Sequence, residues 1–260
     1  MNMKKIFATT ALIVSTLLTG CANTHKDDSV EIYFVRHGKT LFNTYDLVQG
    51  WADSPLTDQG VTVARYLGEG LKDINFDAYY TSDAGRQRET MQVILAQKGV
   101  KNAQVIELKE LREAFFGGFE GGPNSVMAEK AAKQLGFKSG KELYTAMGAG
   151  KVGTEDMDAI AKADPKHQAE TSAQLKARTQ TALQTIINNA IKNKQHRVLV
   201  VSSGTAMKAM ISDLTDNPAK NIPLSNATVV KITYKNNQIT VNEIGSMEYV
   251  QKGKTRLNGN

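Results

Sequence analysis

The chain has 260 residues and 41% hydrophobic residues, enough for one sizeable α/β domain or two small ones. Its formal charge of +6 comes without a long basic run or a basic stripe interleaved with aromatic residues, so no nucleic-acid partner is expected. The one cysteine, Cys21, excludes an internal disulfide.

The amino-terminal segment has the pattern of an export signal. Two lysines precede an apolar stretch over residues 6–18, which is too short to span a bilayer. The Leu-Thr-Gly sequence at 18–20, followed by Cys21, resembles the bacterial lipobox, in which the cysteine is lipidated. We expect residues 1–20 to be removed and residues 21–29 to tether an exported domain, lipid-anchored at the bacterial cell membrane. The alternative is a chance cysteine near an ordinary cleavage site.

Hydrophobic periodicity predicts strands that alternate with helices from residue 30 to residue 250. The first half has a strand over 30–35, a polar loop to about 56, a helix with its N-cap at Thr57, a strand over 77–81, a helix over 85–98 and a strand over 105–108. An insertion of short helices over about 117–170 follows, and then a helix with the apolar face Leu183, Ile186, Ile187, Ala190 and Ile191. The last elements are a strand over 198–201, a helix over 205–214 and a hairpin over 228–234 and 239–245. We therefore expect an α/β fold, a three-layer sandwich with a mostly parallel sheet flanked by helices, and a helical insertion over the site. Residues 251–260 are expected to form a polar tail.

The sequence Arg36-His37-Gly38 directly follows the first predicted strand. In α/β sheets, ligands bind at the carboxyl ends of the strands. An imidazole at that place can act as nucleophile or base, and a neighbouring guanidinium can hold a phosphate by two hydrogen bonds. The alternative is a capping histidine beside a surface arginine.

Three further side chains follow strand ends. Asn43 can donate an amide hydrogen bond to a phosphate oxygen, and Arg86 begins a helix whose N-terminus can face the same anion. Glu113 can protonate a leaving oxygen and then activate water. Each residue also has an ordinary explanation, as a turn residue, a solvated helix residue or a surface carboxylate. Together, at strand ends, they favour a phosphoryl-transfer site.

Four sequence blocks, over residues 34–43, 49–60, 80–90 and 111–121, carry a family resemblance. They resemble, in order, the motifs of the histidine phosphatase superfamily, in its phosphoglycerate-mutase-like branch. The resemblance implies a nucleophilic His37 that forms a phosphohistidine and needs no metal or other cofactor. It also implies the remaining roles, which are phosphate binding by Arg36, Asn43 and Arg86, and acid–base catalysis by Glu113.

The chain departs from the family pattern at one catalytic position. The family has a second catalytic histidine in a Ser-His-Gly context, and here Ser203 stands in its place, followed by Gly204. Losing one preorganised donor typically costs about 10²–10³ in rate. Three explanations stay open. The protein is a slow phosphatase whose other donors suffice, Lys208 or His167 supplies the missing donor, or the fold is kept only to bind phosphorylated ligands. Ser203 and Gly204 are themselves expected to be phosphate-binding residues.

We therefore expect a phosphomonoester hydrolase that acts on a small phosphorylated substrate. The block over 111–121 resembles the phosphatase members more than the glycolytic mutases, and export would separate a mutase from its pathway. The acid-phosphatase and phytase branch is not favoured, because its Arg-His-Gly-x-Arg-x-Pro pattern fails at Thr40 and Phe42. The alternative is a catalytically weak or inactive surface lipoprotein that binds phosphorylated ligands. The sequence indicates neither the substrate nor the oligomeric state.

Overall fold

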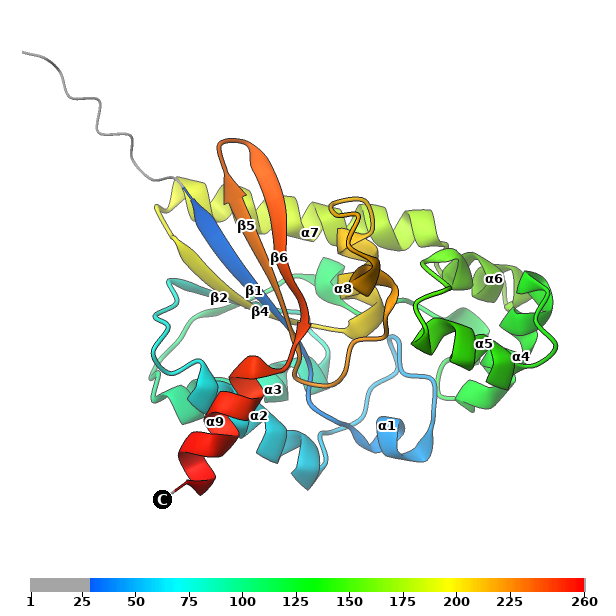
Figure 1. Ribbon diagram of the computed structural model, residues 1–260, viewed down its shortest axis with the longest axis horizontal. Helices are drawn as coiled ribbons and strands as arrows, with labels where there is room; N and C mark the ends of the chain where they lie inside the picture. The colour runs from blue at the N-terminus through cyan, green and yellow to red at the C-terminus, as the bar shows by residue number, and fades with distance from the viewer. Residues whose placement is uncertain (1–28, 260) are drawn as a thin grey trace, which may run out of the picture.

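One six-stranded sheet organises the computed structural model, which describes residues 29–259. The predicted signal, Cys21 and residues 22–28 of the predicted tether lie outside the described residues. The strands are β1 (Val30–Arg36), β2 (Ala78–Thr81), β3 (Val105–Glu107), β4 (Arg197–Ser202), β5 (Val229–Lys235) and β6 (Gln238–Ser246). Their order is β3-β2-β4-β1-β5-β6 (Figure 1). The first four strands pair in parallel, and β5 pairs antiparallel with both of its neighbours, β1 and β6. The predicted mostly parallel α/β sheet is confirmed.

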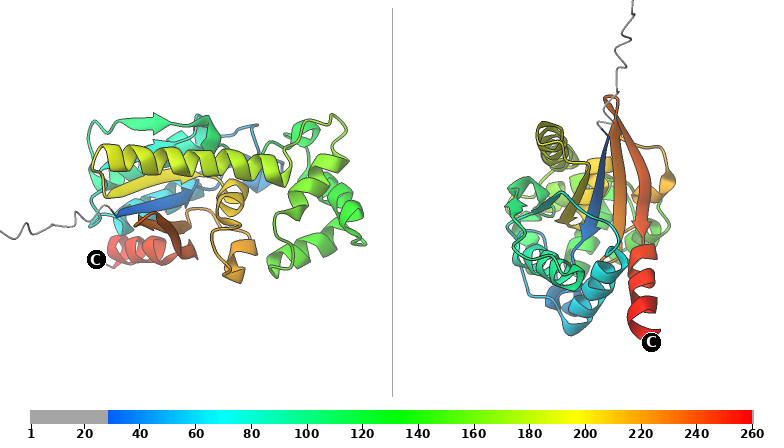
Figure 2. Two further views of the ribbon diagram at one scale, coloured as in Figure 1. Left: turned by 90° about the horizontal axis from the view of Figure 1, so that it is seen from above. Right: turned by 90° about the vertical axis from the view of Figure 1, so that its left-hand side faces the viewer.

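Helices cover both faces of this sheet (Figure 2). The α-helices within residues 29–259 are α1 (Leu41–Tyr45), α2 (Asp58–Gly70), α3 (Gly85–Lys98), α4 (Asn124–Leu135), α5 (Gly140–Gly148), α6 (Glu155–Ala163), α7 (Ser172–Lys192), α8 (Gly204–Ile211) and α9 (Glu248–Asn258), of which α7 and α8 cover one face of the sheet and α2, α3 and α9 the other. Side chains alternate along β1, so Ile32 and Phe34 pack with α7 and α8. Tyr33 and Val35 pack on the other face with α2, α3 and α9. The sheet is therefore the buried middle layer of three.

Three sequence predictions about helices agree with the structure, the last of them in part. The helix predicted over 85–98 is α3 with the same bounds, and Thr57 caps α2 by accepting the Gly60 N–H. The apolar face of α7 is confirmed at four of its five predicted positions, but Ile191 is 41% exposed. At 100° per residue, Ile191 lies about 90° from the centre of that apolar face, so it turns toward solvent.

The predicted polar tail over 251–260 is wrong, because residues 248–258 form α9. This helix packs against α2 at very close range. A Cβ on Gly70 would overlap the Tyr249 carbonyl oxygen, and a Cβ on Gly253 would overlap that of Tyr66. One glycine from each helix, Gly253 of α9 and Gly70 of α2, thus lets the two backbones approach, and Val250 is the buried apolar residue of α9.

Two further segments have more structure than the sequence pattern indicated. The polar loop after β1 contains α1, whose N-cap Thr40 and third residue Asn43 form a capping box. The insertion holds α4, α5 and α6 around a hydrophobic cluster of its own, beside α8 in Figure 1. No helix within residues 29–259 is both long and apolar enough to cross a bilayer.

Candidate active site

His37 lies immediately after β1 and is 3% exposed. Its Nδ1 is 2.8 Å from the Gly38 carbonyl oxygen. A carbonyl can only accept, so Nδ1 carries the proton and Nε2 keeps the lone pair. Burial, and then the charges of Arg86 and Arg36, hold the imidazole pKa well below 6.5. The ring is therefore uncharged at neutral pH, with a lone pair on Nε2.

The guanidinium groups of Arg36 and Arg86 lie close enough to influence each other and His37. Arg36 donates from Nη1 to the Leu224 carbonyl, and its burial lowers its pKa. The Nε atoms of both arginines are buried without a partner among the described residues, as is Nε2 of Gln49. Buried unpaired donors are rare. These three N–H groups are suited to the oxygens of a bound phosphate.

The outer nitrogens of Arg86 are occupied by the segment over residues 49–53, which we call the 49–53 loop. They donate to the carbonyls of Gly50 (2.8 Å) and Ala52 (3.1 Å) and to Asp53 Oδ1 (2.8 Å). Asp53 also accepts the Gly85 N–H at 2.5 Å, at the N-terminus of α3. The anion at this helix N-terminus is thus the Asp53 carboxylate, in the position where the sequence predicted phosphate.

Glu120 holds the other side of the 49–53 loop. Its carboxylate accepts the N–H groups of Gly50 (3.1 Å), Trp51 (2.9 Å) and Ala52 (2.9 Å). It also accepts the N–H of Phe116 at 3.0 Å. Because Arg86 binds the carbonyls of the same loop, Glu120 indirectly orients that arginine. The sequence blocks contained Glu120, but no local pattern indicated this role.

Glu113 lies against the first turn of α8 and is 7% exposed. Its Oε1 accepts the N–H groups of Ala206 (2.8 Å) and Ala114 (2.9 Å), and Oε2 accepts that of Thr205 (3.1 Å). The negative charge of this carboxylate is close enough to Arg36 to favour the charged form of the guanidinium, which opposes the lowering of the Arg36 pKa by burial. Oε1 accepts two N–H groups, whereas Oε2 accepts only one and keeps a lone pair through which it can exchange a proton with a leaving group.

Ser203 is the N-cap residue of α8 and is fully buried. Its hydroxyl oxygen accepts from Gln87 Nε2 at 2.7 Å, which leaves the hydroxyl hydrogen available to donate. Gly204 lies against the Arg36 side chain, since a Cβ there would be 3.4 Å from Arg36 Nε. The structure thus brings Gly204 beside Arg36 and Ser203 beside Gln87. The role of Gln87 was missed because it follows no sequence signature.

Asn226 links Asn43 to the His37 backbone, and sequence reasoning missed this residue as well. Asn226 Nδ2 donates to the His37 carbonyl (3.0 Å) and to Asn43 Oδ1 (3.4 Å). Asn226 lies in the loop before β5, where no pattern marks it.

Of the two candidate replacement donors, Lys208 is buried beside Arg36 and Glu113, while His167 is exposed and has a left-handed φ of 53°.

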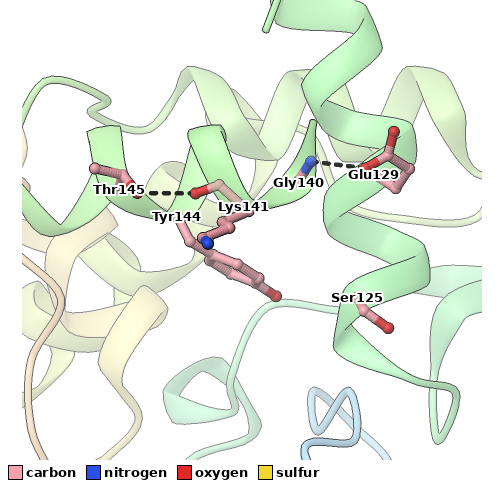
Figure 3. A pocket seen from close by; sticks show the side chains of 6 residues that line it. All are labelled: Ser125, Glu129, Gly140, Lys141, Tyr144 and Thr145. Carbon is pink, nitrogen blue, oxygen red and sulfur yellow. Dashed lines mark hydrogen bonds between the residues drawn. The ribbon is translucent and has the colours of Figure 1, made fainter. Parts of the chain in front are cut away.

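Two hollows are relevant to ligand binding. A cavity of about 160 Å³ adjoins the site, lined by Arg36, Glu113, Met147, Asp156, Gly204, Thr205, Lys208, Pro223 and Leu224. A larger one of about 450 Å³ lies between α4 and α5, where Figure 3 shows the Tyr144 ring. The Tyr144 hydroxyl donates to the Asn124 carbonyl at 3.2 Å. None of the predicted site residues lines this second hollow.

Known proteins share both the sequence pattern and the fold. The model of the histidine phosphatase superfamily (branch 1) matches residues 32–246. A 2,3-bisphosphoglycerate-dependent phosphoglycerate mutase from Methylocella silvestris is 30% identical over 208 residues, which cover 78% of this chain and 91% of the relative. The crystal structure of phosphoglycerate mutase from Bacillus anthracis superposes with a TM-score of 0.82 at 38% identity, covering 88% of this chain and 98% of the other. A putative alpha-ribazole-5'-P phosphatase from Escherichia coli shares the fold, with a TM-score of 0.63 at 20% identity, covering 84% and 96%.

Proposed function

The chain belongs to the histidine phosphatase superfamily, and from this premise we propose that it hydrolyses phosphate monoesters through a phosphohistidine at His37. The observation that carries the proposal is the protonation of the imidazole. Nδ1 is tied to the Gly38 carbonyl, so Nε2 is free to attack phosphorus. The unpaired Nε–H groups of Arg36 and Arg86 support it as donors for the phosphoryl oxygens.

The reaction has two balanced steps. In the first, His37 Nε2 bonds to phosphorus while the P–O ester bond breaks, and protonated Glu113 gives its proton to the leaving oxygen. In the second, water attacks phosphorus, Glu113 accepts the water proton, and the N–P bond breaks to release phosphate. The two arginines stabilise the charge on the phosphoryl oxygens in both steps.

We propose that Ser203 makes this reaction slow. Its hydroxyl lies in the position of a family histidine, but it is neutral and shared with Gln87. A second candidate is phosphoryl transfer from the phosphohistidine to another hydroxyl, as the names of the mutase relatives suggest. A third is phosphate-ester binding without turnover.

One experiment separates the three. The purified protein is incubated with a ³²P-labelled phosphomonoester and a non-phosphorylated acceptor alcohol, beside His37→Asn. Hydrolysis gives inorganic phosphate and an acid-labile label that His37→Asn lacks. A mutase instead labels the acceptor. Binding without either product supports the ligand-binding alternative and refutes hydrolysis.

We also propose that the domain is exported and anchored by lipid on Cys21. The lysine-flanked apolar stretch over residues 6–18 and the lipobox-like sequence at 18–21 support this. Cells that express the full chain are grown with radiolabelled palmitate. Label in the wild-type protein that disappears in Cys21→Ser supports the anchor, and an unlabelled wild-type protein refutes it.

A further inference from the structure

The cavity of about 160 Å³ beside the site is lined by charges of both signs. Arg36 and Glu113 come from the proposed catalytic machinery. Lys208 comes from α8 and Asp156 from α6 of the insertion. The volume is below the 300–1,000 Å³ common for pockets that take drug-sized ligands. A group of a few heavy atoms therefore fits, and a nucleoside does not.

Lys208 and Asp156 are both deeply buried and do not pair with each other. They are 7% and 6% exposed, and each lies within electrostatic range of the other. No salt bridge joins them, and Lys208 Nζ has no hydrogen-bond partner among residues 29–259. Asp156 Oδ1 accepts the adjacent Met157 N–H at 2.9 Å. Buried charges normally have a partner, so this pair leaves a gap that a ligand can bridge.

We propose that this cavity binds the leaving group of the substrate, and that Lys208 and Asp156 select one that carries both a carboxylate and an ammonium group. The inference rests on the proposed function, because it names the substrate class for the same site. Lys208 donates to the carboxylate, and Asp156 accepts from the ammonium. A leaving group with only a negative charge would face Asp156 and Glu113, and one with only a positive charge would face Lys208 and Arg36.

Burial makes each unpartnered charge costly, which supports the same assignment. It raises the pKa of Asp156 to about 6 and lowers the pKa of Lys208. A ligand that brings the opposite charge to each group offsets both effects. Because Asp156 belongs to the insertion and Lys208 to the sheet domain, the subsite needs both parts of the chain.

Four small phosphomonoesters that differ in the charged groups of the leaving alcohol test the subsite. O-phosphoserine carries both groups, O-phosphoethanolamine only the ammonium, 3-(phosphonooxy)propanoate only the carboxylate, and ethyl phosphate neither. In Lys208→Met, the ratio of kcat/KM for O-phosphoserine over O-phosphoethanolamine should fall about 10- to 100-fold. In Asp156→Asn, the ratio of O-phosphoserine over 3-(phosphonooxy)propanoate should fall by a similar factor. Ratios divide out any general loss of activity.

Two surface variants, Lys162→Met and Asp216→Asn, are matched controls because both residues are exposed, and circular dichroism confirms folding of every variant. If Lys208→Met does not fold, Lys208→Gln replaces it. His37-dependent hydrolysis with unchanged ratios overturns the subsite but not the proposed function. If no probe is hydrolysed, the proposed function fails, and calorimetric Kd ratios for the same probes decide the subsite. Ratios that shift as stated support it, and unchanged ratios overturn it.

Discussion

Replacing Ser203 by histidine tests whether the missing imidazole limits the rate. The position is fully buried at the start of α8, next to Gly204, which lies against the Arg36 side chain. One preorganised donor aimed at the transferring group contributes about 10²–10³ in rate, or about 3–4 kcal/mol. Ser203→His should therefore raise kcat for phosphomonoester hydrolysis by up to that factor.

The same substitution should lower stability, because the imidazole takes the space next to Gln87. Gln87 Nε2 loses its 2.7 Å bond to the Ser203 hydroxyl and keeps only a longer one, 3.4 Å, to the Leu111 carbonyl. Overpacking and the weakened buried donor each cost about 1–3 kcal/mol. At about 2–4 °C per kcal/mol for a chain of this size, a summed cost of about 2–6 kcal/mol should lower Tm by roughly 4–24 °C.

Steady-state kcat and a thermal melt followed by circular dichroism measure the two effects, with Ser203→Ala as the matched control. Ser203→Ala removes the hydroxyl hydrogen that is free to donate, so it should lower kcat while leaving the imidazole of His37 in place. If Ser203→His folds and neither variant changes kcat, the position has no direct part in the reaction and the reasoning is refuted.

Three other changes have defined outcomes. Glu120→Ala removes the acceptor of three N–H groups in the 49–53 loop, so Arg86 loses its orientation. As a result, KM for a phosphomonoester should rise about 10-fold or more in steady-state assays. Gly253→Ala places a Cβ on the Tyr66 carbonyl, so α9 must shift; Tm should fall by several degrees with kcat of the folded protein retained. Because the folded protein lowers the pKa of His37, acidification just below pH 6.5 protonates this imidazole in the unfolded chain first, and the free energy of unfolding falls. The His37→Gln variant should therefore lose less stability than wild type over that pH interval, as measured by urea titrations.

Each of these changes also has a result that contradicts it. An unchanged KM in Glu120→Ala would mean that the 49–53 loop keeps its shape without the carboxylate. A Tm for Gly253→Ala equal to that of wild type would show that α9 is not held at close range to α2. Identical pH dependence in His37→Gln and wild type would show that the folded imidazole titrates near its ordinary pKa.

The sequence predicted those parts of the fold that local pattern determines. The buried strand before Arg36, the bounds of α3 and the cap of α2 each follow from apolar periodicity or capping chemistry within a few residues. The helix α9 was missed because it is held by close backbone packing at Gly253 of α9 and at Gly70 of α2. That fit depends on the partner surface, which no local pattern contains.

Some residues of the candidate site could likewise be placed from the sequence, and others could not. Arg36 and Glu113 follow strand ends, so chain topology brings them together and the sequence could place them. Glu120, Gln87 and Asn226 act through hydrogen bonds to distant backbone or side-chain atoms. Such partners are decided by how the loops pack, and polar side chains of this kind are common in ordinary loops and helices.

The hydrogen bond between His37 and the Gly38 carbonyl also decides the regiochemistry of a covalent phosphoenzyme. With the π nitrogen protonated and tied to the backbone, only the τ nitrogen can carry phosphorus. A trapped adduct should therefore react with antibodies specific for the τ isomer and not with those for the π isomer.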